Sequence, residues 1–377
     1  MADPCAPLAP QPKLPDLEPK YRDQVAGRFN EVLTAARKVA EPPVDVDEAK
    51  IVVFSDHHKG ARDGADDFQR GERAYCAALG YYLEQGYQLY VLGDAEELWE
   101  ETPQRVTRCY SEVLELEAEF LRPDRAGMVR FFGNHDDLWE DPAQVRRHFG
   151  GFFPGETVRE ALLLPLTDGN EALGELLFVH GHQGTTESDK FGRWARLPVR
   201  YLWRPLQRKL GYSATTPASD FGLRGTHDRA MFEWVNSQER DRPLILITGH
   251  THRPVFSLPK PPARDVEEIA AELGGASGEG AADLRAELEH ARAIKRDRAA
   301  TALSVDPPCY FNSGCCSFPD GDITGLEIEG GEIRLVRWPD DDEKPCRRPL
   351  GNRFLRDIFT AVLDAEPGQA EIIEQVL

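Results

Sequence analysis

Apolar residues recur along this chain in two patterns, which alternate over most of its length. Residues 21–40, 68–85 and 104–122 have apolar positions three or four apart, the spacing of a helix that buries one face. Short apolar runs, typical of buried strands, lie in the stretches 51–55, 87–94, 127–136, 175–182 and 243–252. Strands separated by helical segments predict a layered α/β fold.

The two ends of the chain and two internal segments depart from that alternation. Stretches within 309–338 read as short strands with Gly-rich turns, which favours antiparallel pairing. We therefore expect five parts: a proline-rich disordered arm at 1–20, an N-terminal helix and linker at 21–49, a main domain at 50–340 with helical insertions at about 185–240 and 260–302, and a helical tail at 341–377.

Composition narrows the class of protein. The chain has 377 residues and a net charge of −20, and no apolar run approaches the roughly 18 residues that span a bilayer. Its seven cysteines are scattered without a C-x-x-C pair, which is typical of a reducing compartment. The first residues contain no apolar stretch of the secretory type. We expect a cytoplasmic protein, either free or peripheral to a membrane.

Polar clusters follow five of the predicted strands directly. Seven of the ten histidines lie in four of these clusters. In open α/β sheets, ligands bind beyond the carboxyl ends of strands, so the clusters should meet. Burying so many polar groups together costs several kcal/mol without compensation, and a metal centre would supply it. The clusters are Asp56-His57-His58, Gly93-Asp94, Gly133-Asn134-His135-Asp136, His180-Gly181-His182 and Gly249-His250-Thr251-His252.

The ligand types in these clusters narrow the choice of metal. Carboxylate, imidazole and amide donors without thiolate favour Mn, Fe, Zn or Co over Ca²⁺. Seven donors exceed the needs of one ion, and two ions that share a carboxylate, about 3.5–4 Å apart, fit better. We expect two divalent transition-metal ions, and of the candidate metals Mn²⁺ is the one we favour.

The order of the motifs resembles the calcineurin-like metallophosphoesterases, with D-x-H, G-D-x-x-[DE], G-N-H-[DE], a strand-end His and G-H-x-H. The resemblance covers about residues 50–340. It implies a fold of two mixed β-sheets sandwiched between helices, with a helical cap insertion. It also implies hydrolysis of a phosphodiester or pyrophosphate bond by a hydroxide that two metal ions activate.

The same resemblance implies a role for each matching residue. His135 would stabilise or protonate the leaving oxygen, and Asp136 beside it would be a second catalytic residue. Apart from the resemblance, Asp56 and His58 are two apart on an extended strand end and project to one face, so His57 should face away and pack. Glu97 would orient His135 or a metal ligand, or cap a backbone group. The implied ligands are Asp56, His58 and His252 for one ion, Asn134, His180 and His250 for the other, and Asp94 as the bridge.

Residues 190–209 stand apart from the acidic remainder. They hold seven basic residues and no acidic one, so the rest of the chain carries −27. The arginines recur at spacings of three or four with Trp194 and Trp203 among them, a pattern that suits an anionic membrane surface or a lipid phosphate. The alternative is a lid whose arginines pair with the acidic body. The substrate-contact candidates are Arg193, Arg196 and Arg200.

The sequence GDAEELW resembles the G-D-x-x-E-x-W motif of UDP-2,3-diacylglucosamine hydrolases, which cleave a pyrophosphate. His182 stands where those enzymes have an aspartate. The resemblance implies a lipid-linked or nucleotide-sugar substrate. Two alternatives stay open, a metal-dependent nuclease and a catalytically silent metal-binding scaffold. Duplex binding needs an extended positive track, so nucleic acid is not an expected partner of so acidic a chain.

Overall fold

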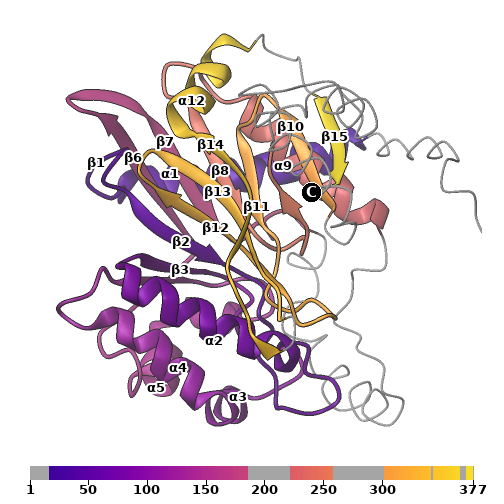
Figure 1. Ribbon diagram of the computed structural model, residues 1–377. Coiled ribbons are helices and arrows are strands. Elements are labelled where there is room, and N and C mark those ends of the chain that lie inside the picture. Colours follow the sequence, from indigo (N-terminus) through magenta and orange to yellow (C-terminus); the bar gives the residue numbers. More distant parts are fainter. Residues whose placement is uncertain (1–16, 186–220, 258–300, 341–342, 366–370, 377) are drawn as a thin grey trace, which may run out of the picture.

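Two mixed sheets pack face to face between helices (Figure 1). This computed structural model describes residues 17–185, 221–257, 301–340, 343–365 and 371–376. The arrangement confirms the predicted layered α/β fold with two mixed sheets. The residues of the predicted cap before position 221, and nearly all of the predicted 260–302 insertion, lie outside the described residues.

The first sheet carries the candidate site residues that come later in the sequence, after β7 and β8. Among the described residues it has eight strands, in the order β1-β6-β7-β8-β11-β9-β10-β15. Strand β8 lies between β7 and β11 and is parallel to both. The strands are β1 (Val44–Asp45), β6 (Ala161–Asp168), β7 (Glu171–Val179), β8 (Leu244–Thr248), β9 (Pro254–Val255), β10 (Thr301–Asp306), β11 (Tyr310–Ser313) and β15 (Glu371–Val376).

The second sheet carries the candidate site residues that come earlier in the sequence, after β2, β3 and β4. Its order is β14-β13-β12-β2-β3-β4-β5, with seven strands in the described part of the chain. Strands β2, β3 and β4 are parallel neighbours, so their carboxyl ends lie at one edge. The strands are β2 (Lys50–Phe54), β3 (Gln88–Leu92), β4 (Met128–Phe131), β5 (Val158–Arg159), β12 (Ile323–Glu329), β13 (Glu332–Trp338) and β14 (Arg348–Phe354).

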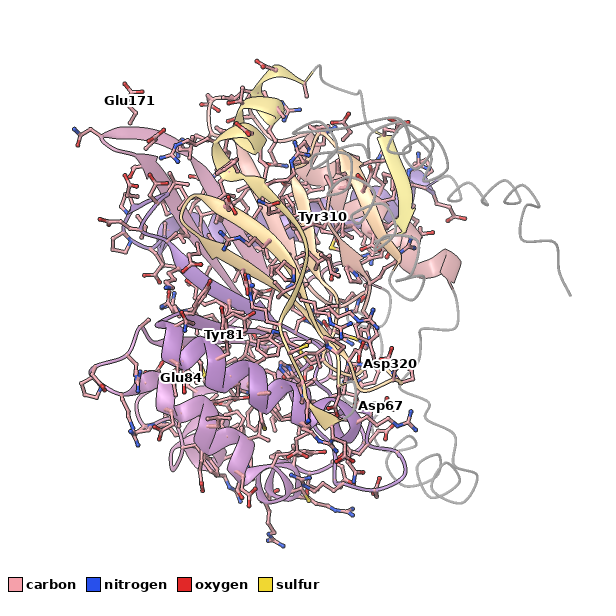
Figure 2. The ribbon with its side chains drawn as sticks, in the orientation of Figure 1. Asp67, Tyr81, Glu84, Glu171, Tyr310 and Asp320 are labelled. Atoms are coloured by element: carbon pink, nitrogen blue, oxygen red, sulfur yellow. The ribbon has the colours of Figure 1, made fainter. Side chains whose placement is uncertain are left out.

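Helices cover the outer faces of both sheets. Helix α2 runs along the second sheet, with Asp67 just before its first residue and Glu84 near its last (Figure 2), and α4 packs against it. Helix α1 packs against β6 and α9, and α9 packs against β8 and β11. The helices are α1 (Pro19–Lys38), α2 (Phe68–Gln85), α3 (Pro103–Cys109), α4 (Ser111–Ala118), η1 (Glu119–Leu121), η2 (Asp137–Glu140), α5 (Pro142–Phe149), α9 (Phe221–Asn236) and α12 (Leu355–Asp364).

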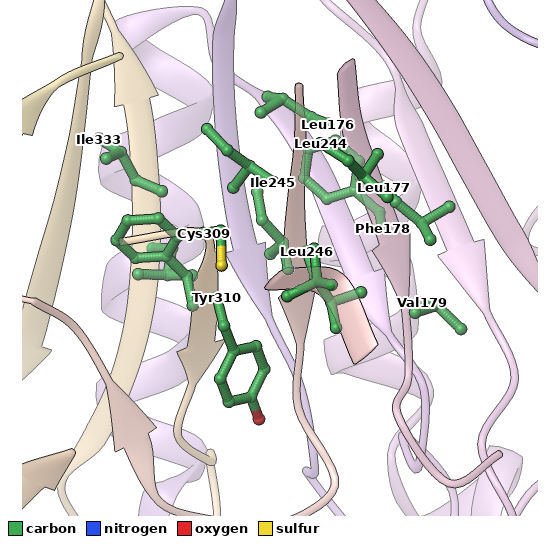
Figure 3. Packing of buried hydrophobic residues seen from close by; sticks show 14 of the residues in the cluster. Leu176, Leu177, Phe178, Val179, Leu244, Ile245, Leu246, Cys309, Tyr310 and Ile333 are labelled. Atoms are coloured by element: carbon green, nitrogen blue, oxygen red, sulfur yellow. The ribbon is translucent and has the colours of Figure 1, made fainter. Parts of the chain in front are cut away.

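The strands alternate their side chains between two hydrophobic cores. On β2, Ile51 and Val53 belong to the larger core, which includes residues of both sheets and of α1 and α9, whereas Val52 and Phe54 join the core beneath α2. This is the period of two that a strand buried on both faces requires. Figure 3 shows the larger core where β7, β8 and β11 meet. The two cores hold the carboxyl ends of the strands in fixed relation.

The last part of the chain differs from the predicted helical tail over 341–377. Helix α12 is helical, but β14 pairs with β13 and β15 pairs with β10. The residues of β14 are exposed or half-buried, so no apolar alternation marks the strand in the sequence. Its pairing with β13 decides its conformation.

The predicted helix over 104–122 also differs, because it breaks at Tyr110 into α3 and α4. Within the described residues, no helix is both long enough and apolar enough to cross a bilayer.

Candidate metal centre

The carboxyl ends of strands from both sheets meet at one place and bring the five polar clusters together. The N–H of Asp56, after β2, donates to the carbonyl of Gly93, after β3, at 3.1 Å. The N–H of Gly249 donates to the carbonyl of His180 at 2.9 Å. The N–H of His250, in the first sheet, donates to the Asp56 carboxylate, in the second, at 2.8 Å. The two sheets are therefore joined at the site itself.

Most of the candidate ligands have an unusual backbone. Seven non-glycine residues in the described chain have positive φ, and five of them are candidate ligands. Such conformations cost of the order of 1–3 kcal/mol each and persist where the surroundings over-determine them, most often at functional sites. The five are Asp56 (54°), His58 (52°), Asp94 (46°), His250 (69°) and His252 (55°).

The glycines of the motifs allow the loops to approach each other. A Cβ at Gly93 would lie 2.6 Å from the His180 ring, and a Cβ at Gly133 would lie 2.2 Å from the Asp94 carboxylate. Real Cβ atoms do not come this close to other atoms, so an alanine at either position would force the loops apart. The G-D and G-N-H motifs therefore need glycine because the loops touch.

One candidate ion site is formed by Asp56, His58 and His252. Their ligand atoms lie within 4.8 Å of one another. His252 Nε2 lies 3.2 Å from Asp56 Oδ1 and 3.1 Å from His58 Nε2. Two ring nitrogens and a carboxylate oxygen thus converge on one point, two of them from the loop after β2 and one from the loop after β8.

A second candidate site is formed by Asp94, His180 and His250, whose ligand atoms also lie within 4.8 Å of one another. His180 Nδ1 donates to the carbonyl of Leu92 at 2.8 Å, so on the neutral ring the lone pair is on Nε2, which lies 3.1 Å from Asp94 Oδ2. The buried Asn134 Oδ1 accepts no hydrogen bond from the described residues. A buried amide oxygen without a donor fits a cation ligand.

Asp94 lies between the two sites. Its Oδ2 is 3.1 Å from His180 Nε2 and 4.0 Å from His58 Nε2. The structure therefore brings the sequence-predicted bridging residue next to a ligand from each cluster.

The electrostatics of the centre favour a cation. Burial alone raises the pKa of the Asp94 carboxyl, but His180 and His135 outweigh it and hold that pKa well below its ordinary 3.8. Burial lowers the pKa of His180, but Asp94 and Asp56 raise it to about 9. Two buried carboxylates thus draw positive charge into the centre. These carboxylates, the imidazole nitrogens and the Asn134 amide oxygen together form a donor set that suits divalent transition metals.

His135 is held on three sides. Its Nδ1 lies 2.7 Å from Glu97 Oε2, its backbone N–H donates to Asp94 Oδ1 at 2.7 Å, and its ring stacks on Trp99. Burial lowers the pKa of His135, but the Glu97 and Asp94 carboxylates raise it to about 10. His135 is therefore held in one orientation and carries a proton at neutral pH.

Glu97 contacts a second histidine as well. Its Oε2 lies 3.1 Å from His58 Nδ1, so one carboxylate orients both His135 and a candidate ligand. Burial raises the pKa of Glu97, but the two histidines outweigh it and lower the pKa to about 2. Of the roles that the sequence left open, these contacts favour the orienting one.

Asp136 and His57 lie beside the centre without facing it. The Asp136 carboxylate accepts backbone N–H groups of Gly133 at 2.6 Å and of Ala95 at 2.8 Å, contacts that fix two loops against each other. These contacts position the loops, and the catalytic role implied for Asp136 stays a prediction. The fully buried His57 packs edge-on against Tyr75, with ring centroids 4.5 Å apart.

Two features of the surroundings escaped the sequence analysis. One is a buried ion-pair network behind the loops, in which Lys59 and Arg130 both contact Glu96 and Glu117. The other is His227 of α9, whose ring lies 5.4 Å from that of His250. No local motif in the sequence marks either feature. Arg193, Arg196 and Arg200, like all of 190–209, lie outside the described residues.

Of the comparisons with known proteins, the match to a family model agrees with this site. The profile of the family described as calcineurin-like phosphoesterase matches residues 49–254. No curated protein matches the chain significantly. Solved structures similar to it include the vacuolar protein sorting 29 protein of Cryptosporidium parvum, at 11% identity over 81% of this chain and 98% of that one, with a TM-score of 0.32. Another is the Entamoeba histolytica Vps29 complexed with Zn²⁺, at 13% identity over 80% and 98%, with a TM-score of 0.29.

Proposed function

The chain belongs to the calcineurin-like phosphoesterase family, and from that premise we propose a phosphohydrolase with two metal ions that cleaves a phosphodiester or pyrophosphate bond. Membership makes the protein a metal-dependent phosphoesterase that acts on phosphate esters. The number of ions, their identity and the substrate are the proposal. The position of Asp94 between two ligand clusters is the observation that carries it.

Seven residues would hold the ions. Asp56, His58 and His252 would bind one and Asn134, His180 and His250 the other, with Asp94 shared. We propose Mn²⁺ as the native ion, with Fe, Zn or Co as alternatives that the same donors accept. When bound, such a pair supplies charge to phosphoryl oxygens and lowers the pKa of a coordinated water.

The side chains around the ions would position the proton. Glu97 accepts from His135 Nδ1, so the ring is oriented with its other nitrogen, Nε2, directed away from Glu97. The raised pKa of His135 keeps a proton on Nε2 at neutral pH. We propose that this proton goes to the leaving oxygen as the phosphorus–oxygen bond breaks. A donor placed in this way contributes about 10²–10⁴-fold to a rate.

Metal titration tests the proposal directly. Protein stripped with a chelator and titrated with Mn²⁺ should bind about two equivalents, as expected of a two-metal site. Asp94→Asn should weaken both equivalents, because each site loses the shared charge, whereas Asn134→Ala should weaken one. A single equivalent that gives full activity would contradict the pair.

We further propose that the substrate is a lipid-linked or nucleotide-sugar pyrophosphate. Two features support this, the G-D-x-x-E-x-W motif around Asp94 and the basic, Trp-containing segment 190–209. A contact with an anionic membrane through that segment, in the cytoplasm, belongs to the same proposal. The scattered cysteines support a reducing compartment, and the six in the described chain form no disulfide.

A double variant separates a substrate-binding segment from a structural lid. Arg196→Glu with Arg200→Glu should raise KM for a lipid-linked pyrophosphate and abolish binding to anionic vesicles. Cleavage of a small chromogenic phosphodiester should change little. Equal losses on both substrates, with a lower melting temperature, would favour the lid. Cleavage of DNA by the metal-loaded protein would favour the nuclease alternative, and inactivity on every ester would favour the silent scaffold.

A further inference from the structure

Two consecutive residues of helix α9 reach the two loops that carry the histidine ligands of the first sheet. His227 contacts the His180-Gly181-His182 turn after β7, and Asp228 contacts the loop Gly249–His252 after β8. Both side chains are nearly fully buried, with 4% and 1% exposure. The contacts therefore lie inside the protein, behind the candidate ion sites.

His227 links that turn to the N-terminal helix. Its Nε2 lies 2.6 Å from the carbonyl oxygen of Gly181, and its Nδ1 lies 2.7 Å from the hydroxyl of Tyr21 on α1. A carbonyl only accepts, so Nε2 carries the proton, and Nδ1 then accepts from the Tyr21 hydroxyl. The neutral ring thus uses both nitrogens, and each bond fixes the direction of the other.

Asp228 holds the second loop through its middle residue. Its Oδ1 accepts from Thr251 Oγ1 at 2.9 Å and from the Tyr310 hydroxyl at 2.7 Å. Figure 3 shows Tyr310 extending from β11 away from the neighbouring aliphatic side chains. Asn312 of the same strand donates to Thr251 Oγ1 at 3.1 Å and to the Gly249 carbonyl at 2.6 Å. Thr251 is therefore held from two elements at once.

The loop after β8 needs such support. His250 and His252, on either side of Thr251, have φ of 69° and 55°, whereas the φ of 111° at Gly181, after β7, is one that glycine adopts readily. A histidine in this region of φ is less stable than in an ordinary one and keeps it only if its surroundings impose it. Hydrogen bonds to residues around metal ligands typically change metal affinity by about 10–100-fold.

We propose that His227 and Asp228 are positioning residues of the metal centre, which hold the two ligand loops of the first sheet in place, the strained loop after β8 among them. This inference rests on the metal centre of the proposed function. It also gives a role to α1, which precedes the matched range 49–254 and reaches the site through Tyr21. His227 should act mainly on the site that contains His180, whereas Asp228 should act on both sites.

Mn²⁺ binding to chelator-stripped protein tests this without turnover. His227→Phe, which keeps a ring but no polar atom, should weaken one of the two equivalents by about 10–100-fold. Asp228→Leu should weaken both. The conservative variants His227→Gln and Asp228→Asn keep a donor or an acceptor and should retain most of the affinity. They also keep the test open if the harsher variants fail to fold.

Phe232→Leu is the matched control, because Phe232 is a buried core residue of the same helix. It should lower the melting temperature of the metal-free protein and leave Mn²⁺ affinity as in the wild type. Wild-type affinity in His227→Phe and Asp228→Leu, or an equal loss in Phe232→Leu, would overturn the inference while the metal centre stands. A wild-type protein that takes up no Mn²⁺ would overturn both.

Discussion

Trp99 stacks on His135, with ring centroids 4.3 Å apart and the planes 16° from parallel. The Trp99 indole also donates to the carbonyl of Asn134 at 2.6 Å, so one side chain holds both the proton donor and the backbone of a candidate ligand. Together with Glu97 it explains why the loop after β3 has glutamate and tryptophan two residues apart.

Trp99→Leu should lower kcat by about two- to tenfold, since a stacked aromatic pair is worth about 0.5–1.5 kcal/mol. Trp99→Phe retains a ring and should lose less. Steady-state kinetics on a chromogenic phosphodiester would measure both. An unchanged kcat in Trp99→Leu would show that Glu97 alone fixes the His135 ring.

His135→Ala should lose about 10²–10⁴-fold in kcat, the usual contribution of a general acid. Its metal content should not change, because His135 is assigned to the leaving group and not to an ion. Elemental analysis beside the kinetics separates the two effects. Loss of metal together with activity would make His135 a ligand.

Glu117→Gln should destabilise the protein strongly. Glu117 is fully buried and accepts from Lys59 Nζ at 2.8 Å and from the Tyr75 hydroxyl at 3.1 Å, and it pairs with Arg130. Breaking a buried ion pair by removing one partner costs about 3–5 kcal/mol. Urea unfolding would measure the loss. Glu115→Gln, at an exposed position of the same helix, should stay within about 0.5 kcal/mol.

The stability of the metal-free protein should fall as the pH drops below about 6.5, in part because of His57. Burial, Lys59 and Arg130 hold the pKa of His57 well below its ordinary 6.5. The unfolded chain therefore binds a proton that the folded chain excludes, which lowers the free energy of unfolding by about 1.4 kcal/mol per pH unit.

His57→Phe should remove that share of the slope between pH 5 and 6.5, roughly one proton's worth. Denaturant unfolding at several pH values would measure it. His148→Phe is the control, since His148 is only half-buried and should change the slope less. The same slope in His57→Phe as in the wild type would mean that His57 takes up a proton in the folded protein.

The sequence by itself determined the parts of the fold that have a local period. The continuous apolar run at Ile51–Phe54 and the helical spacing at 68–85 indicate which side chains meet a core, and the structure has a strand and a helix there. The motif glycines and the strand-end Asp, Asn and His residues were also visible, because each occupies a fixed place after an apolar run.

Tertiary structure alone decided how those strand ends meet and what stands behind them. The contact of His227 with Gly181 joins residues 46 apart, and that of Asp228 with Tyr310 joins residues 82 apart. The pairing of β14 with β13 and of Lys59 with Glu117 is equally non-local. Such contacts depend on how layers pack and not on neighbours in the chain, so no periodicity or spacing announces them.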